Sequence, residues 1–127
     1  PQGLPGIETL GSLLYSEGVR KNRFSVERMV ELISANPAKR FGLYPEKGSL
    51  EVGTDADLVV FAPDKSKVLN SANLHMNTDF SPFNGRRSQG WPRYVFLRGR
   101  PILKEDEFLG QEGEGNWIPR DKVNQRR

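Results

Sequence analysis

The chain changes its hydrophobic pattern near Leu43, and this change constrains the fold more than any other feature. Before Leu43, apolar residues recur every three or four positions, which is the spacing that one face of a helix requires. After it, short apolar runs alternate with Gly, Pro and Asp, which is typical of strands and turns. The sequence therefore predicts an α+β chain, with helices first and a small sheet after them.

Two helices and a short third one are expected before Leu43. Residues 7–15 carry the first apolar face, and Gly18 is expected to stop that helix. Asn36 is expected to cap a new short helix, because the proline that follows it is tolerated at the first helical position. In that helix Ala38 and Phe41 should face inward. The second helix is predicted by an apolar stripe of Val26, Met29, Val30 and Ile33.

Short strands are expected in the second part of the chain. Residues 49–52 form the first predicted strand, and residues 58–61 form a continuous apolar run, typical of a strand covered on both faces. Pro63 and Asp64 predict a turn, after which residues 67–69 would pair back.

A hairpin is expected near the end of the predicted sheet. Residues 94–97 and 101–103 flank Arg98-Gly99, a pattern that indicates two strands and a tight turn. Residues 108–109 could add a short strand. The segment 70–92 is rich in Asn, Ser and Gly and is expected to be irregular.

Charge and composition exclude several classes of protein. The net charge is +3, but acidic residues are mixed among the basic ones, and no aromatic-plus-basic motif for nucleic acid is found. The basic residues at the end of the chain are interpreted as a solvated tail (Arg120, Lys122, Arg126 and Arg127). The absence of Cys excludes disulfides and thiolate metal sites. No apolar run reaches the roughly 18 residues of a membrane span, so neither a nucleic-acid nor a membrane partner is expected.

Residues that could carry chemistry are sparse. A metal hydrolase site needs several His or carboxylate ligands around one ion, but the only histidine is His75. We interpret His75 as a structural or surface residue. A Ser-His-Asp triad is formally available, yet no Gly-x-Ser-x-Gly turn exposes a nucleophile. Phosphate-loop and dinucleotide-binding fingerprints are also missing from the sequence.

Two residue pairs leave alternatives open. Asp55 and Asp57 would share one face of a strand, where they could bind a cation or act as acid and base; alternatively they shape a turn, because Asp favours turns. Trp91 and Trp117 could anchor a partner subunit, or they could close the local core.

Several motifs together resemble the hydantoinase, dihydropyrimidinase and allantoinase branch of the amidohydrolase superfamily. Residues 47–59 read Lys-Gly-Ser-Leu-Glu-Val-Gly-Thr-Asp-Ala-Asp-Leu-Val, which is similar to the superfamily signature Lys-Gly-x-Ile-x-x-Gly-x-Asp-Ala-Asp-Leu-Val. The branch is indicated by segments 6–10, 13–19, 36–39, 41–45, 75–77, 80–85, 97–99 and 108–110. The resemblance extends to about Arg120.

The resemblance implies a (β/α)₈ barrel of the TIM type beside a β-sandwich. Residues 1–43 would be the last helices of the barrel domain. Residues 44–109 would be the C-terminal portion of the sandwich, with 70–92 as an irregular insert, and residues 110–127 would be an extended C-terminal arm. The chain is thus expected to be a C-terminal fragment.

The resemblance also implies an activity for the complete protein. Such an enzyme would open the ring amide bond of hydantoins or dihydropyrimidines to N-carbamoyl acids, with two zinc ions or similar divalent metals. Their ligands (His residues, a carboxylated Lys and an Asp) are expected upstream of Pro1, so no catalytic or metal-binding residue is predicted in this chain, which should be inactive alone. The expected partners are the remainder of the same protein and further copies, in a dimer or tetramer in the cytoplasm.

One substrate contact is expected within this chain. The family loop at this place usually reads Pro-Asn-Gly, and its backbone contacts the amide of the cyclic substrate. Here it reads Pro1-Gln2-Gly3, so Gln2 and Gly3 are the predicted substrate-binding residues. An alternative stays open, because dihydropyrimidinase-related proteins of the same fold lack the metal site and act as non-catalytic assembly partners.

Overall fold

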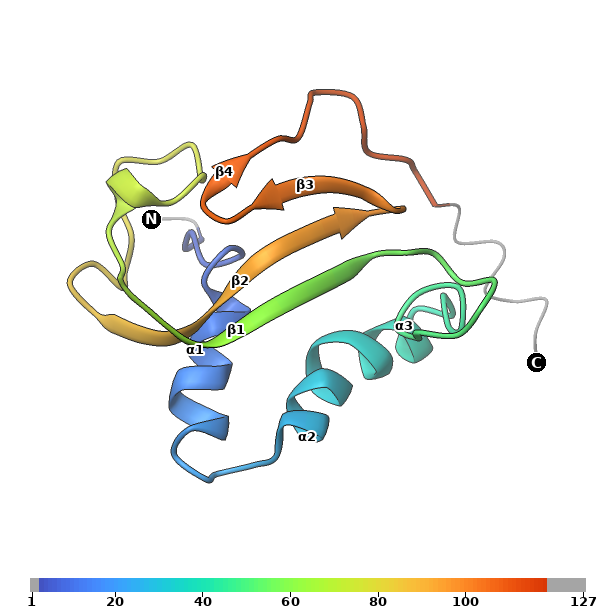
Figure 1. Ribbon diagram of the computed structural model, residues 1–127, viewed down its shortest axis with the longest axis horizontal. Coiled ribbons are helices and arrows are strands. Elements are labelled where there is room, and N and C mark those ends of the chain that lie inside the picture. Colours follow the sequence, from blue (N-terminus) through green and yellow to red (C-terminus); the bar gives the residue numbers. More distant parts are fainter. Residues whose placement is uncertain (1–2, 119–127) are drawn as a thin grey trace. The chain divides into compact units, whose positions relative to one another are not determined.

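The structure, a computed structural model, describes residues 3–118 and contains helices followed by a four-stranded sheet (Figure 1). The strand order is β1-β2-β3-β4, and the pairs β2–β3 and β3–β4 are antiparallel. The predicted α+β character is therefore confirmed. Gln2, the basic tail and the end of the predicted arm lie outside the described residues.

The described residues divide into two compact units. The first unit takes its residues from Pro1–Val26 and Phe61–Pro92, and the second from Glu27–Val60 and Arg93–Arg127. Strands β1 and β2 each contribute residues to both units.

The first helix begins and ends later than predicted. Helix α1 (Leu10–Leu14) continues directly into η1, a π-helical turn (Tyr15–Val19). The prediction that Gly18 stops the helix is wrong, because Gly18 lies inside η1. Gly18 is needed there for another reason: a Cβ atom at this position would overlap the ring of Phe24.

The second helical segment is continuous, so the predicted restart at Asn36 is also wrong. Helix α2 (Val26–Val30), π-helical turn η2 (Glu31–Ala35) and helix α3 (Asn36–Arg40) follow one another without a break. A proline inside a regular α-helix clashes with the preceding turn. The wider π-helical turn directly before Asn36 accommodates the proline at position 37.

Only part of the predicted inner face of this segment is covered. Met29 and Ala38 are buried, as the periodicity predicts. Val26, Val30 and Ile33 are exposed, and Phe41 is exposed rather than inward-facing. Phe41 follows the last helical residue, so it no longer shares the helical face of Ala38.

Residues 49–52 form no strand, contrary to the prediction. This segment is a bend followed by a turn, in which the N–H of Thr54 donates to the carbonyl of Glu51. Leu50 and Val52 project into solvent. Because β propensity mainly reflects packing against adjacent strands, residues this exposed gain little from a strand conformation.

Strand β1 (Leu58–Val68) runs straight through the predicted turn at Pro63. A proline cannot donate to a strand ladder, so it is tolerated on an edge strand, and β1 is at the edge of the sheet. The prediction that residues 58–61 are covered on both faces is wrong, because Val59 and Val60 are exposed.

The segment expected to be irregular contains the start of a strand. After the 3₁₀ turn η3 (Ser71–Asn73) the chain enters β2 (Arg87–Leu97). Two backbone hydrogen bonds hold the ends of this loop together, from Leu69 N–H to Arg86 O and from Gly85 N–H to Leu69 O.

The predicted hairpin is confirmed. Strand β3 (Arg100–Lys104) pairs with β2 through a bulge at Val95/Phe96, and β4 (Glu107–Phe108) pairs with β3. Arg98 and Gly99 have φ angles of 47° and 80°. Positive φ at both central residues is typical of the two-residue hairpin turn that matches strand twist.

The buried core of the first unit is small. It consists of Leu69, Leu74 and Trp91, against which Leu13, Met76 and Phe83 pack. Gly90 permits this packing: its φ is 88°, and a Cβ atom there would overlap the ring of Tyr15 and lie 2.7 Å from Phe61 Cε1.

Candidate functional site

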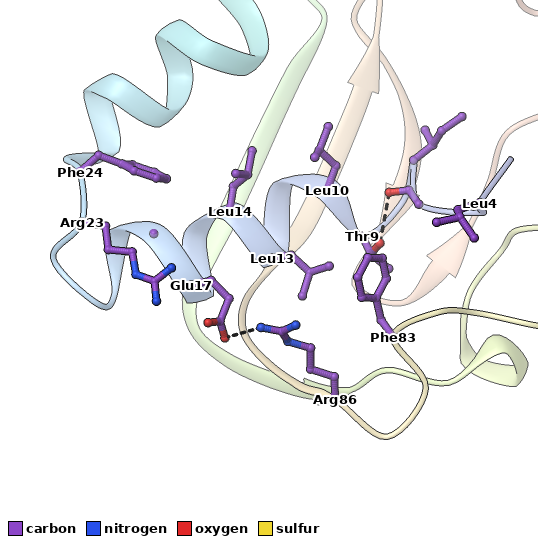
Figure 2. A pocket seen from close by; sticks show the side chains of 13 residues that line it. Leu4, Thr9, Leu10, Leu13, Leu14, Glu17, Arg23, Phe24, Phe83 and Arg86 are labelled. Atoms are coloured by element: carbon purple, nitrogen blue, oxygen red, sulfur yellow. Dashed lines mark hydrogen bonds and ion pairs between the residues drawn. The ribbon is translucent and has the colours of Figure 1, made fainter.

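The first unit contains an apolar groove of about 620 Å³ beside α1. Figure 2 shows side chains from the start of the chain, from α1 and from the loop before β2 arranged around it. We call this feature the apolar groove and define it by its apolar side chains: Leu4, Ile7, Leu10, Leu13, Leu14, Phe24 and Phe83.

Local contacts hold the walls of the apolar groove. The Thr9 hydroxyl is buried and donates to the carbonyl of Gly6 (3.1 Å), which fixes the turn before α1. The side chain of Ser88 donates to the carbonyl of Ser12 (3.2 Å), and the N–H of Gln89 donates to the Ser16 hydroxyl. These bonds attach α1 and η1 to the start of β2 within the first unit.

Charged side chains line one end of the groove: Glu17, Arg23 and Arg86. Glu17 pairs with Arg86 at 3.1 Å (Figure 2) and with Lys21 at 2.5 Å. The hydrogen bonds from Lys21 and Arg86 lower the pKa of the Glu17 carboxyl below its usual value. The groove therefore offers an apolar floor and a charged end at which Glu17 is paired with Arg86.

The second unit contains a polar network around Lys47, which we call the Lys47 network. The Lys47 ammonium lies 2.7 Å from Asp55 Oδ2 and also pairs with Asp57 Oδ2. The other oxygen of Asp57, Oδ1, accepts from the backbone N–H of Arg98 at 2.8 Å. Next to it, the N–H of Gly99 donates to the carbonyl of Ala56.

Ionisation of these groups follows from their partners. Burial opposes the charge of Asp57, but the hydrogen bonds from Lys47 and from the Arg98 N–H outweigh it and lower the pKa of Asp57. Burial likewise opposes the charge of Lys47, but Asp55 and Asp57 together raise the pKa of its ammonium. The Asp57 carboxylate is thus held as an anion by the Lys47 ammonium and the Arg98 N–H.

This arrangement favours the turn-shaping interpretation of Asp55 and Asp57. The Lys47 ammonium pairs with one oxygen of each carboxylate, and the second oxygen of Asp57 accepts from the Arg98 N–H. Lys47 was not predicted to belong to this site. It could have been, because it is the first residue of the same motif. The motif brings the loop at 47–57 and the hairpin turn together.

His75 is tied to one carboxylate. Its ring Nδ1 lies 2.8 Å from Glu8 Oε1, and its backbone N–H donates to Glu8 Oε2 at 2.7 Å. Glu8 precedes α1, so the pair connects the start of the chain with the segment after β1. This double contact supports the structural interpretation of His75.

The two tryptophans have different environments. Trp91 is 3% exposed and lies in the core of the first unit, so the local-core alternative is confirmed for it. Trp117 is 88% exposed and borders a cavity of about 250 Å³ in the second unit. Its predicted role as an anchor for a partner subunit stays a prediction.

The described residues do not fit a metal centre. Between residues 3 and 118, no group of three or more His, Cys, Asp or Glu side chains could hold a metal ion. In the same part of the chain, no helix has the length and apolarity needed to cross a membrane. Of the two predicted substrate contacts, Gly3 is described and lies exposed, with a φ angle of 105°.

Comparison with known proteins places this chain among amidohydrolases. The sequence model of the Amidohydrolase family matches residues 7–102. A D-hydantoinase of Geobacillus stearothermophilus is 41% identical over 122 residues, which cover 96% of this chain and 26% of the relative. The chain therefore spans about a quarter of the length of the curated relatives it matches.

Solved structures agree with the sequence match. A D-hydantoinase (dihydropyrimidinase) from Thermus sp. superimposes on 97% of this chain, with a TM-score of 0.91 and 37% identity, over 27% of its own length. An L-hydantoinase (dihydropyrimidinase) from Arthrobacter aurescens superimposes on 90%, with a TM-score of 0.85 and 37% identity, over 25% of its length. The predicted resemblance is confirmed, and the chain belongs to the amidohydrolase family.

Proposed function

We propose that this chain is the C-terminal segment of a metal-dependent cyclic amidohydrolase. The complete protein would open the ring amide bond of hydantoins or dihydropyrimidines and release N-carbamoyl acids. The observation that carries the proposal is the 41% identity to a D-hydantoinase over nearly the whole of this chain. Within the proposal, this segment supplies structure, and the metal ligands belong to residues upstream of it.

The proposal includes a domain assignment, which extends the family resemblance of the sequence. Residues 1–43 would close the barrel domain, residues 44–109 with the insert 70–92 would form the C-terminal portion of the sandwich, and residues 110–127 would form the arm. The helices between Leu10 and Arg40 and the antiparallel strands after Leu58 support this order. The proposal includes a cytoplasmic dimer or tetramer.

Gln2 and Gly3 remain the proposed substrate contacts. A Cβ atom at Gly3 would meet nothing within 4 Å, and its φ angle of 105° is one that residues with side chains rarely adopt. A backbone in this conformation, open to its surroundings, supports a main-chain contact with the ring amide.

The test is a ring-opening assay on the full-length protein purified with zinc. We expect it to convert hydantoin or dihydrouracil to the N-carbamoyl product, measured by chromatography, whereas the 127-residue chain alone should convert neither. Because this chain is similar to enzymes named D- and L-hydantoinase, a racemic 5-substituted hydantoin should also be supplied, and the product's configuration determined.

A full-length, zinc-loaded protein that opened none of these rings would contradict the proposal. That result would favour the non-catalytic, dihydropyrimidinase-related alternative. Turnover by the 127-residue chain alone would also contradict it, since the segment is proposed to lack the metal ligands.

A further inference from the structure

Two contacts join Glu8 and His75 across 67 positions of the chain. The ring Nδ1 of His75 lies 2.8 Å from Glu8 Oε1, and the backbone N–H of His75 donates to Glu8 Oε2 at 2.7 Å. A carboxylate can only accept hydrogen bonds, so the first contact requires the hydrogen on Nδ1. Because one residue engages both oxygens, the direction of the Glu8 side chain is fixed as well as its distance.

The backbone of His75 is held by the core of the first unit. Leu74, the residue before it, is buried in that core, and Met76, the residue after it, packs against the core. Protein interiors are closely packed, so residues anchored in them have little freedom to move. His75 therefore offers Glu8 a partner with a fixed position.

Glu8 lies in the turn that leads from the start of the chain into α1. In this turn the hydroxyl of Thr9 donates to the carbonyl of Gly6 at 3.1 Å (Figure 2), and the N–H of Leu10 donates to the same oxygen at 3.1 Å. Thr9 is fully buried. The turn is thus held together internally, and the contact between Glu8 and His75 joins it to the core.

The segment between Glu8 and Gly3 is short and stiff. Four residues separate the two, and one of them is Pro5, whose ring fixes its own φ and disfavours helical backbone at Leu4 before it. A movement of Glu8 is therefore passed on to Gly3 rather than absorbed between them. Gly3 is one of the two proposed main-chain contacts of the ring amide.

We propose that His75 is a positioning residue for the ring-opening reaction, which acts through Glu8 on the main chain at Gly3. The inference rests on the proposed function, in which this main chain binds the ring amide. His75 contributes neither a proton nor a metal ligand; it determines where the loop meets the substrate. A main-chain contact made equally to the substrate and to the transition state affects KM, whereas kcat is unchanged by its loss.

Steady-state kinetics of the full-length, zinc-loaded protein on dihydrouracil and hydantoin test the proposal. His75→Ala removes the ring, whereas His75→Asn keeps an amide N–H close to the position of Nδ1. Arg93→Ala is the matched control, because it breaks an exposed ion pair of similar length, 2.6 Å to Glu105, in the second unit. The free energy of unfolding of each variant is measured alongside.

We expect His75→Ala to raise KM at least about tenfold while kcat changes less than about twofold. His75→Asn should return KM to within about threefold of the wild-type value, because it restores the hydrogen bond to Glu8. Arg93→Ala should leave both constants unchanged. A purely structural role predicts the opposite: a smaller active fraction lowers kcat and leaves KM as it was. That result, or a KM that His75→Asn does not restore, would overturn the proposal.

Glu8→Gln provides a second test should His75→Ala fail to fold. It keeps the size of the side chain but offers one accepting oxygen in place of two, so KM should rise at least about threefold; an unchanged KM would overturn the proposal. The wild-type assay separates the two hypotheses. A wild-type protein without ring opening refutes the proposed function and this inference with it, whereas ring opening with an unchanged KM in His75→Ala refutes the inference alone.

Discussion

The Lys47 network finds partners for its polar groups within this chain, whereas the apolar groove leaves apolar side chains exposed. In the Lys47 network every oxygen of Asp57 has a partner from the second unit itself, Lys47 or the Arg98 N–H. In the groove, Ile7 and Leu10 have their side chains in solvent. One region satisfies its own polar groups, and the other leaves apolar surface without cover.

The difference shows that polar pairing is satisfied locally in this segment, whereas burial of apolar area is not. Hydrogen bonds and ion pairs close over short distances, so a motif of eleven residues and a hairpin turn suffice for the Lys47 network. Burial of apolar area needs opposing surface, and the core of Leu69, Leu74 and Trp91 is small. We therefore expect this segment to need contacts with further parts of the polypeptide for its hydrophobic stabilisation.

The largest effect should follow from removing the core beneath the groove. Trp91→Ala in the full-length protein should lower the free energy of unfolding by about 3–5 kcal/mol, the usual range for a buried aromatic residue. Denaturant titration measures the change. Trp117→Ala is the matched control and should cost far less, because Trp117 is 88% exposed; equal losses would contradict the core assignment.

A smaller but clear loss is expected for Gly90→Ala. The added Cβ would overlap Tyr15, and the φ angle of 88° is unfavourable for any residue with a side chain. Overpacking of this kind costs about 1–3 kcal/mol, readable as a lowered Tm. Gly115→Ala should leave the Tm unchanged, since nothing lies within 4 Å of its Cβ position.

The Lys47 network is tested by Asp57→Asn, with Asp64→Asn as an exposed control on β1. The change weakens the pairing with Lys47 and should lower the free energy of unfolding by about 1 kcal/mol. This is less than a fully buried charged hydrogen bond contributes, because Asp57 is partly exposed. If the control lost as much stability as Asp57→Asn, the network would contribute nothing specific.

The same network predicts a small pH dependence. The pKa of Asp57 is lowered in the folded protein, so its stabilisation is present above the unfolded value of about 3.9 and is lost as pH falls through the folded value. The raised pKa of Lys47 means that its contribution is present below about 10.4 and is lost as pH rises through the folded value. Asp57→Asn should flatten the acid limb of stability against pH, and an unchanged limb would contradict this assignment.

The sequence predicted features whose causes are local. The hairpin turn at Arg98-Gly99 and the burial of Met29 and Ala38 follow from turn residues and helical periodicity. The superfamily signature was found because its residues are contiguous. Its structural role could be predicted only in part, since the Arg98 N–H that donates to Asp57 lies 41 positions away in the chain.

Errors arose where contacts outside the local sequence pattern decide the outcome. Gly18 was interpreted as a helix stop, but it makes room for Phe24. Pro63 was interpreted as a turn, but its edge position lets β1 continue through it. The groove itself depends on Phe83 and Arg86 lying beside residues near the start of the chain, and nothing in the local pattern indicates that proximity.

The central claim is that this segment supplies structure while the rest of the polypeptide supplies chemistry. Complementation tests it most directly: the 127-residue chain and the upstream remainder are produced separately and together, with zinc, and ring opening of hydantoin and dihydrouracil is measured. We expect no turnover from either piece alone and restored turnover when both are produced together. Full activity from the upstream remainder alone, or any activity from the 127-residue chain alone, would contradict the claim.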